Sequence, residues 1–357
     1  MANHLLLAII IFIFFKEATA AASYNVKKFG AKPDGRTDSS KPFMSAWSAV
    51  CGSTKPATIY VPKGRYMLGG LRFRGPCKNR AITIRIDGTL VAPSDYRVLG
   101  NANYWLLFSR VEGVTIQGGT LDAQGARLWA CKSANSKNCP EGATSLAIYN
   151  SNKVVVNGLT SLNSQMFHMV VNGCNNVRMI GVNVVAPWNS PNTDGIHVQY
   201  STGVTILNSK LTTGDDCVSI GPGSSNLWIE NVACGPGHGI RVTFKGTQNG
   251  LRIKSWARPS SGFVNGVLFQ NAIMTNVQNP IYQDIHGTSA TKVAVKFDCS
   301  KMNPCRGITM QDVNLSFKNQ LSAASSYCMN AGGKASGVSL VKGSEVSQLT
   351  EPVAGKL

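Results

Sequence analysis

The stretch VVVNGLTSLNSQMFHMVVNGCNNVRMI at residues 154–180 begins and ends with a short apolar, β-branched run, and each of these two runs is followed by asparagine or glycine. Such a run is typical of a short buried strand that ends in a turn. Two more runs of this kind follow, and the four begin at residues 154, 177, 204 and 227. Because these starts recur at nearly equal intervals, the chain contains a structural repeat.

This period predicts an all-β fold, a right-handed parallel β-helix (a solenoid) in which each coil stacks its strands on the next. Almost no segment has the periodicity of an amphipathic helix, and the consensus of a leucine-rich repeat, the rival for this period, is absent. Asparagines at the turns, such as Asn157, Asn208 and Asn231, fit left-handed positions and side-chain ladders. We expect one amphipathic capping helix, at residues 39–50, over the N-terminal end.

The N-terminus predicts secretion. The apolar run Leu5–Phe15 is too short to span a membrane as a helix, which needs about 20 residues. It is followed by the small-residue pattern Ala18-Thr19-Ala20, so we interpret residues 1–20 as a signal peptide. The expectation is a secreted chain without a transmembrane helix, with a single catalytic domain at residues 23–357 and a monomeric state.

The charge balance points to an acidic partner. Lys and Arg number 35 against 17 Asp and Glu, a net charge of +18, while 43% of residues are hydrophobic, which argues against disorder. A basic secreted protein fits nucleic acid, an anionic membrane or an acidic polysaccharide, and a basic surface without a specific partner is the alternative. Because no nucleic-acid-binding motif is present, we expect neither a nucleic-acid nor a membrane partner.

Ten cysteines in a secreted chain favour disulfides. The pairs that lie close in sequence are Cys51 with Cys77, Cys131 with Cys139, Cys217 with Cys234, and Cys299 with Cys305. Cys174 and Cys328 remain unassigned. The cysteines lack zinc-ligand spacing and the histidines are scattered, so we expect no metal site.

Four polar clusters follow one another between positions 192 and 254: Asn192-Thr193-Asp194, Gly214-Asp215-Asp216, Gly237-His238-Gly239 and Arg252-Ile253-Lys254. The step from Asp194 to Asp215 and the step from Asp215 to His238 are each close to the repeat period. Residues at equal phase lie on the same face of neighbouring coils, roughly 5 Å apart. Taken singly, each cluster is a common turn or solvated strand face, but their shared phase predicts one patch of three carboxylates and a histidine.

Such a patch suits glycoside hydrolysis. One carboxylic acid, with a pKa raised by a like-charged neighbour, can protonate the glycosidic oxygen while the others activate water. Arg252 and Lys254 alternate on a strand, so both point outward and are suited to hold a sugar carboxylate.

The four clusters, in this order, resemble the signatures of plant polygalacturonases, the pectin-hydrolysing glycoside hydrolase family 28. The resemblance extends to VKKFGAKPDG at residues 26–35, SPNTDGIH at 190–197 and the segment from Asp298 to Cys305. It implies a secreted cell-wall enzyme, without a cofactor, that acts on a polyanionic pectate.

The resemblance also implies the role of each site residue. Asp215 would be the general acid, Asp194 and Asp216 would activate the attacking water, and the products would have inverted configuration. His238 would help to set the protonation of the acid. The substrate carboxylate would be held by Arg252 and Lys254, with Asn192 as a further substrate contact.

The chain departs from the family pattern twice. The interval from His238 to Arg252 is about one coil shorter than in the family, and a second segment is missing after Ile281, where Tyr282 aligns with a later coil. If the first deletion is less than a whole coil, Arg252 moves one layer toward Asp215. The alternatives are therefore a catalytically impaired pectin-binding β-helix, or an aberrant splice or gene-model product. A calcium-dependent pectate lyase is a third and weaker reading.

Overall fold

The computed structural model describes residues 22–134 and 138–235, together with shorter segments at 243–245, 272–277, 285–289, 293–298, 305–311, 313–317, 325–337, 339–342 and 345–348. The interpreted signal peptide lies outside the described residues, as do His238, Arg252, Lys254, Cys299 and Tyr282. No helix among the described residues is long and apolar enough to cross a membrane.

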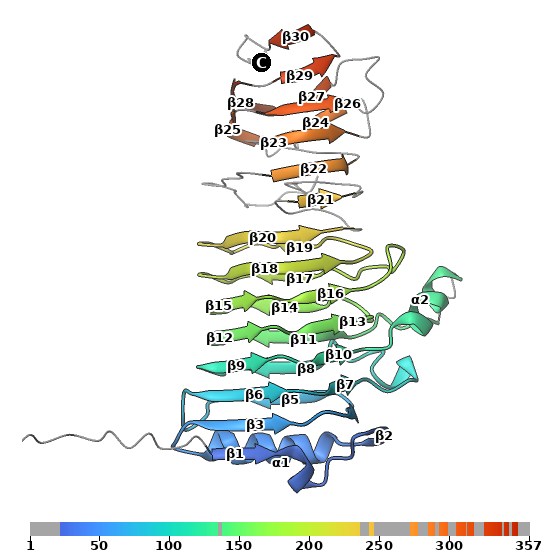
Figure 1. Ribbon diagram of the computed structural model, residues 1–357, viewed down its shortest axis with the longest axis vertical. Coiled ribbons are helices and arrows are strands. Elements are labelled where there is room, and N and C mark those ends of the chain that lie inside the picture. The colour runs from blue at the N-terminus through green and yellow to red at the C-terminus, as the bar shows by residue number, and fades with distance from the viewer. Residues whose placement is uncertain are drawn as a thin grey trace, which may run out of the picture.

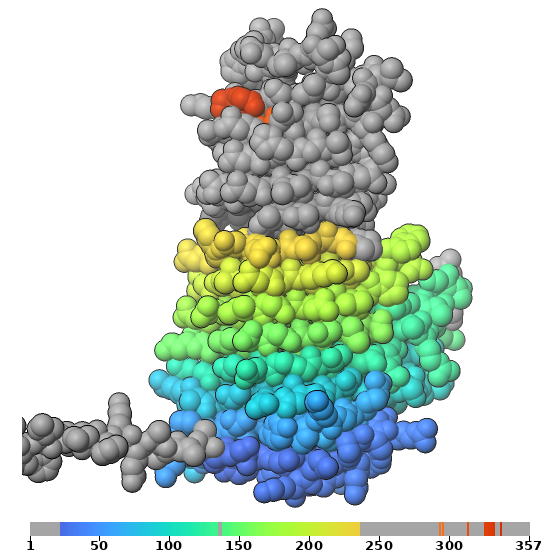
Figure 2. Space-filling model, viewed as in Figure 1, coloured from blue at the N-terminus to red at the C-terminus, as the bar shows by residue number. Residues whose placement is uncertain are grey.

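The chain forms the predicted right-handed parallel β-helix, with successive coils stacked along one axis (Figures 1 and 2). One wall is a six-stranded parallel sheet, which we call the short sheet. Its strands are, in spatial order, β5 (Leu71–Arg74), β8 (Tyr104–Ser109), β11 (Thr144–Tyr149), β14 (Met169–Asn172), β17 (Ile196–Gln199) and β19 (Val218–Ile220).

The other walls belong to a twenty-stranded sheet, which we call the long sheet. Through residue 234 its strands are β1 (Ala22–Asn25), β2 (Asp34–Asp38), β3 (Ala57–Val61), β4 (Arg65–Met67), β6 (Ile82–Ile86), β7 (Thr89–Val91), β9 (Val114–Gln117), β10 (Thr120–Asp122), β12 (Asn152–Asn157), β13 (Thr160–Leu162), β15 (Asn175–Ile180), β16 (Asn183–Val185), β18 (Thr205–Thr212) and β20 (Trp228–Cys234).

The long sheet continues with β21 (Thr243–Lys245), β22 (Ala272–Val277), β23 (Ile285–Ser289), β26 (Asn314–Phe317), β29 (Ser339–Lys342) and β30 (Glu345–Gln348), the last pairing antiparallel with β29. Two strand pairs complete the described chain: β24 (Val293–Asp298) with β27 (Ser325–Met329), and β25 (Cys305–Gln311) with β28 (Ala331–Ser336).

The strand register confirms the repeat. Val154 pairs with Val177, Arg178 with Thr205 and Thr205 with Trp228. The offsets between these partners equal the intervals between the starts of the four apolar runs. The runs recur because each coil must place its apolar side chains on those of the coil beneath it.

Helix α1 (Ser40–Gly52) covers the N-terminal end of the coils, as predicted, although it begins one residue later and ends two residues later than expected. It buries Phe43, Ala46, Trp47 and Val50, the i, i+3, i+4, i+7 face of an amphipathic helix. Trp47 Nε1 also donates a hydrogen bond to the carbonyl of Arg74 in β5, at 3.2 Å. A second helix, α2 (Ala126–Ser133), projects from the side of the coils (Figure 1). Two 3₁₀ helices are η1 (Val26–Phe29) and η2 (Tyr96–Val98).

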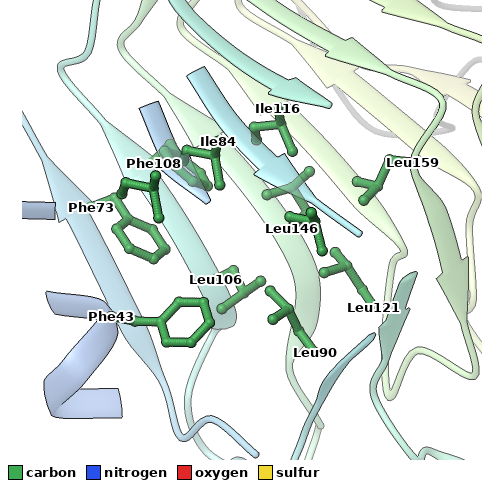
Figure 3. Close-up of a pocket in the computed structure, with 12 residues that line it drawn as sticks. Phe43, Phe73, Ile84, Leu90, Leu106, Phe108, Ile116, Leu121, Leu146 and Leu159 are labelled. Carbon is green, nitrogen blue, oxygen red and sulfur yellow. The ribbon is translucent and has the colours of Figure 1, made fainter. Parts of the chain in front are cut away.

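The interior is an apolar column. Near α1 it encloses a void of about 20 Å³ lined only by apolar side chains, among them Phe43, Phe73 and Leu146 (Figure 3). A void of this size and lining holds no polar ligand, so it is a packing defect of the core and not a binding site.

Asparagines form part of the predicted turn ladder. Asn208 and Asn231 have left-handed φ values of 49° and 51°, and Asn231 Nδ2 donates to Asn208 Oδ1 at 2.7 Å. The expectation for Asn157, the last residue of strand β12, is wrong, because its φ is not positive.

Three of the suggested disulfides are present: Cys51–Cys77, Cys131–Cys139 and Cys217–Cys234. Cys174 is a buried free thiol and Cys328 an exposed one. The suggested Cys299–Cys305 pair includes a residue outside the described chain and stays a prediction.

The coil after β20 is short. Ala233 in β20 pairs with Thr243 in β21, whereas the preceding step along the same row pairs Lys210 with Ala233. The offset between the later partners is less than half of the offset between the earlier ones. The first missing segment is therefore not a whole coil, because removing a whole coil would have left the two offsets nearly equal.

Candidate active site

Asp194 and Asp216 lie level on neighbouring coils, which means that they occupy aligned positions in the strand register. Strands β17 and β19 pair in parallel with His197 opposite Ser219, and each aspartate precedes its strand partner by three positions. The Gly195 amide donates to the Asp216 carbonyl at 2.9 Å and fixes this register. The two aspartate clusters therefore lie on neighbouring coils, and it is Asp216, not Asp215 as the spacing predicted, that lies level with Asp194.

Asp215 is adjacent to this pair. Its Oδ1 accepts a hydrogen bond from the Asp216 amide at 2.8 Å. Asp194 is almost buried, with 7% of its surface exposed, while Asp215 and Asp216 are half-buried. The three carboxyl groups therefore lie where the ends of two adjacent coils reach the surface.

Buried hydroxyl groups hold the two aspartate segments together. Thr193 Oγ1 lies 2.7 Å from Ser190 Oγ and 2.8 Å from Thr213 Oγ1 on the next coil. The Gly214 amide donates to the same Thr193 oxygen at 3.2 Å. A Cβ at Gly214 would collide with the Ser190 carbonyl, which explains the glycine in the Gly-Asp-Asp cluster.

A serine and a histidine that the sequence analysis left without a role contact the site. Ser219 Oγ donates to Asp194 Oδ2 at 2.7 Å, and His197 Nδ1 lies 2.8 Å from Ser219 Oγ. Burial lowers the pKa of His197, against a smaller opposite effect of Gln199 and the Asp216 charge. His197 and Ser219 are separated by about one coil in the sequence, and this spacing was the signal that could have identified them.

Of the remaining predicted site residues, Asn192 is described and the others are not. Asn192 is exposed in the turn before Asp194, with a left-handed φ of 54°. His238, Arg252 and Lys254 lie outside the described residues, so their convergence on the aspartates stays a prediction.

The arrangement offers several carboxylates for proton transfer. Two level carboxylates and an adjacent third meet the basic need of acid and base catalysis on a glycosidic bond. Within the described part of the chain, no three His, Cys, Asp or Glu side chains gather as metal ligands.

Comparisons with known proteins also support a glycoside hydrolase. The model of the family "Glycosyl hydrolases family 28" matches residues 51–284 and 281–337. The boundary between these two matches lies at the second departure from the family pattern. A further family, "Rhamnogalacturonase A/epimerase, pectate lyase-like", matches residues 23–71.

The chain is 56% identical to a polygalacturonase of Prunus persica, over 92% of this chain and 95% of the relative. It is 38% identical to an exopolygalacturonase of Platanus acerifolia, over 87% and 95%.

Two solved structures share the fold. They are the endo-xylogalacturonan hydrolase of Aspergillus tubingensis (TM-score 0.66, 18% identity, 89% of this chain and 92% of that one) and the polygalacturonase of Erwinia carotovora (TM-score 0.65, 20% identity, 91% and 94%). With the aspartate geometry, the family match and the identity to plant relatives, the chain belongs to glycosyl hydrolases family 28 as a glycoside hydrolase of the plant polygalacturonase type.

Proposed function

We propose that this chain is a secreted polygalacturonase that hydrolyses α-1,4-galacturonosidic bonds of cell-wall pectate with inversion of configuration. Asp215 donates the proton to the leaving oxygen, and Asp194 and Asp216 activate the attacking water. His238 sets the protonation of Asp215, and Arg252 and Lys254 hold the galacturonate carboxylate beside Asn192. The enzyme acts as a monomer and needs no cofactor.

One observation carries this proposal, the level placement of Asp194 and Asp216 on paired strands with Asp215 beside them. Three carboxyl groups gathered on two neighbouring coils supply both an acid and a base for hydrolysis of a glycosidic bond. The net charge of +18 supports an anionic substrate, because a basic surface raises the local concentration of a polyanion.

The experiment is the release of reducing ends from polygalacturonate by the secreted protein and by its Asp215→Asn variant. We expect activity in the parent, its loss in the variant, and inverted products by proton NMR of the anomeric signals. Asp95→Asn is a matched control, because Asp95 is a partly exposed carboxylate that caps η2, on a coil distant from β17 and β19. An unsaturated product that requires calcium would instead indicate a lyase.

The short offset between β20 and β21 favours a second candidate, a pectate-binding protein with impaired catalysis. The predicted substrate-binding residues Arg252 and Lys254 follow this short coil, and a displacement of about 1 Å in an active site costs about 10²-fold in rate. The two candidates differ in one result. A folded parent that binds polygalacturonate but releases no reducing ends is a binding protein.

A further inference from the structure

The outward face of the short sheet continues from the aspartates to the N-terminal end of the molecule. Strand β17, next to Asp194, is followed by β14, β11, β8 and β5 in spatial order. The strand register aligns His197 with Val170, Ala147 and Leu107, and then with Arg72 on β5. A chain ligand that leaves the aspartates along this face therefore crosses four strand spacings, about 19 Å, to reach β5.

An aromatic layer covers the middle of this face. Leu107, Ala147 and Val170 point away from the core, and they form a second buried cluster against Tyr104, Tyr149 and Phe167. The three aromatic side chains are themselves half-exposed. The face thus offers a partly apolar surface, which suits the apolar face of a sugar ring and carries no acidic group in the aligned rows of the sheet.

The two tyrosines form a fixed pair. Their hydroxyl oxygens lie 2.6 Å apart and their ring centroids 5.0 Å apart. Burial and this hydrogen bond raise the pKa of Tyr104, while the charge of Arg72 acts in the opposite direction. The Arg72 guanidinium therefore lies within electrostatic reach of the Tyr104 hydroxyl, at the end of the aromatic layer.

Arg72 and Arg74 lie on β5, at the end of the aromatic layer that is farthest from Asp194. Both are exposed on β5, where they alternate with the buried Leu71 and Phe73. Their backbone is anchored, since Trp47 of α1 donates to the Arg74 carbonyl. Within the described residues neither guanidinium takes part in an ion pair, unlike Arg65, Arg80, Arg85 and Arg97.

We propose that Arg72 and Arg74 form a second carboxylate-binding subsite, reached across the Tyr104–Tyr149 layer, for a galacturonate unit distant from the bond held at Asp194. The inference rests on the proposed function, because it takes the same anionic polysaccharide as the ligand. Guanidinium groups bind carboxylates with paired, charge-assisted hydrogen bonds, and aromatic rings supply area at a low cost in side-chain entropy. The subsite makes affinity depend on chain length, because short oligomers at Asp194 do not reach β5.

The experiment measures the dissociation constants of a galacturonate trimer and a galacturonate decamer by titration calorimetry. The parent is Asp215→Asn, which keeps the ligand intact, and the test protein adds Arg72→Gln and Arg74→Gln. We expect the decamer to bind the parent more tightly than the trimer does, and the two substitutions to weaken the decamer about tenfold. The difference in decamer affinity between the parent and the arginine variant should shrink at about 1 M salt, where the Debye length is about 3 Å.

The matched control adds Arg178→Gln and Lys210→Gln, which remove the same charge from exposed positions on the long sheet. Equal decamer binding by the arginine variant and its parent overturns the subsite, as does an equal loss in the control. Failure of the parent to bind either oligomer overturns the proposed function as well. Circular dichroism and the thermal midpoint show whether each variant keeps the parent fold.

Discussion

Ser219 holds Asp194 from the next coil, with its Oγ donating to Asp194 Oδ2 at 2.7 Å. A serine hydroxyl has one proton to donate. Because that proton goes to the carboxylate, the His197 Nδ1 at 2.8 Å from the same oxygen is the donor of the second bond. The histidine therefore carries its proton on Nδ1 when neutral, and it orients the hydroxyl group toward the aspartate.

Replacing Ser219 with alanine removes the bond to Asp194. Loss of a donor to a carboxylate favours its protonated form, so the acidic limb of the kcat/KM profile should move to higher pH. We also expect kcat to fall about 10- to 100-fold, because the carboxylate loses its fixed orientation.

The measurement is the pH dependence of polygalacturonate hydrolysis for Ser219→Ala beside Ser225→Ala. Ser225 lies in the turn before β20 and bonds Thr202, so its loss should leave the profile in place. An unshifted acidic limb in Ser219→Ala would mean that the hydroxyl does not act on Asp194.

The burial of the His168 side chain predicts that folding stability falls at acidic pH. The side chain is fully buried, its Nδ1 bonds Ser161 at 2.8 Å, and burial lowers its pKa to about 3. An unfolded histidine takes up its proton near pH 6.5, whereas the folded one stays neutral until about pH 3. Folding stability should therefore be complete above pH 6.5 and fall by about 1.4 kcal/mol per pH unit as the pH drops toward 3.

Urea unfolding at pH 7, 5 and 4 tests this contribution with His168→Asn. The variant should be less stable at pH 7, because the ring leaves space in the core. Its loss of stability between pH 7 and pH 4 should be smaller than that of the parent. Identical pH slopes for the two proteins would show that other groups cause the acid sensitivity.

The sequence predicted the coils well, because stacked coils require apolar runs at regular intervals in the sequence. Val154 and Val177 must lie over each other in the core, and this requirement makes apolar residues recur at intervals of one coil along the chain. Helix α2 was not expected, since it is too short for a clear helical period within the insertion between β10 and β11.

The site was predicted in part for the same reason. The spacing compared Asp194 with Asp215, which is one position away from Asp216, the residue that the strand register aligns with Asp194. Ser219 was not recognised, because a serine on an outward strand face is ordinary, and its separation of one coil from His197 gains meaning only once the folded register places it at the Asp194 carboxylate. The short coil was visible as a shortened interval, but the fraction of a coil that remains could be measured only from the pairing of β20 with β21.

The asparagine ladder predicts a stability difference between alanine and glycine. Asn231 has a left-handed backbone and donates to Asn208. Asn231→Ala should destabilise by about 1 to 3 kcal/mol, because it loses the bond and forces alanine into the left-handed region. Asn231→Gly loses the same bond but adopts this φ freely, so urea midpoints should place it between alanine and the parent. Equal midpoints for the two variants would contradict the role of the backbone.

The Cys217–Cys234 disulfide should affect activity as well as stability. Its cysteines are separated by 17 positions in sequence, and removing the bond by Cys217→Ser with Cys234→Ser should cost about 3 kcal/mol. Cys217 directly follows Asp216, so the open form also frees the end of the coil that carries Asp215 and Asp216. The Cys131–Cys139 bond joins a cysteine of α2 to one 8 positions later, and its double serine variant should lose stability while keeping more of its kcat. Equal losses of kcat at matched fractions folded would show that the Cys217–Cys234 bond stabilises the fold without positioning Asp216.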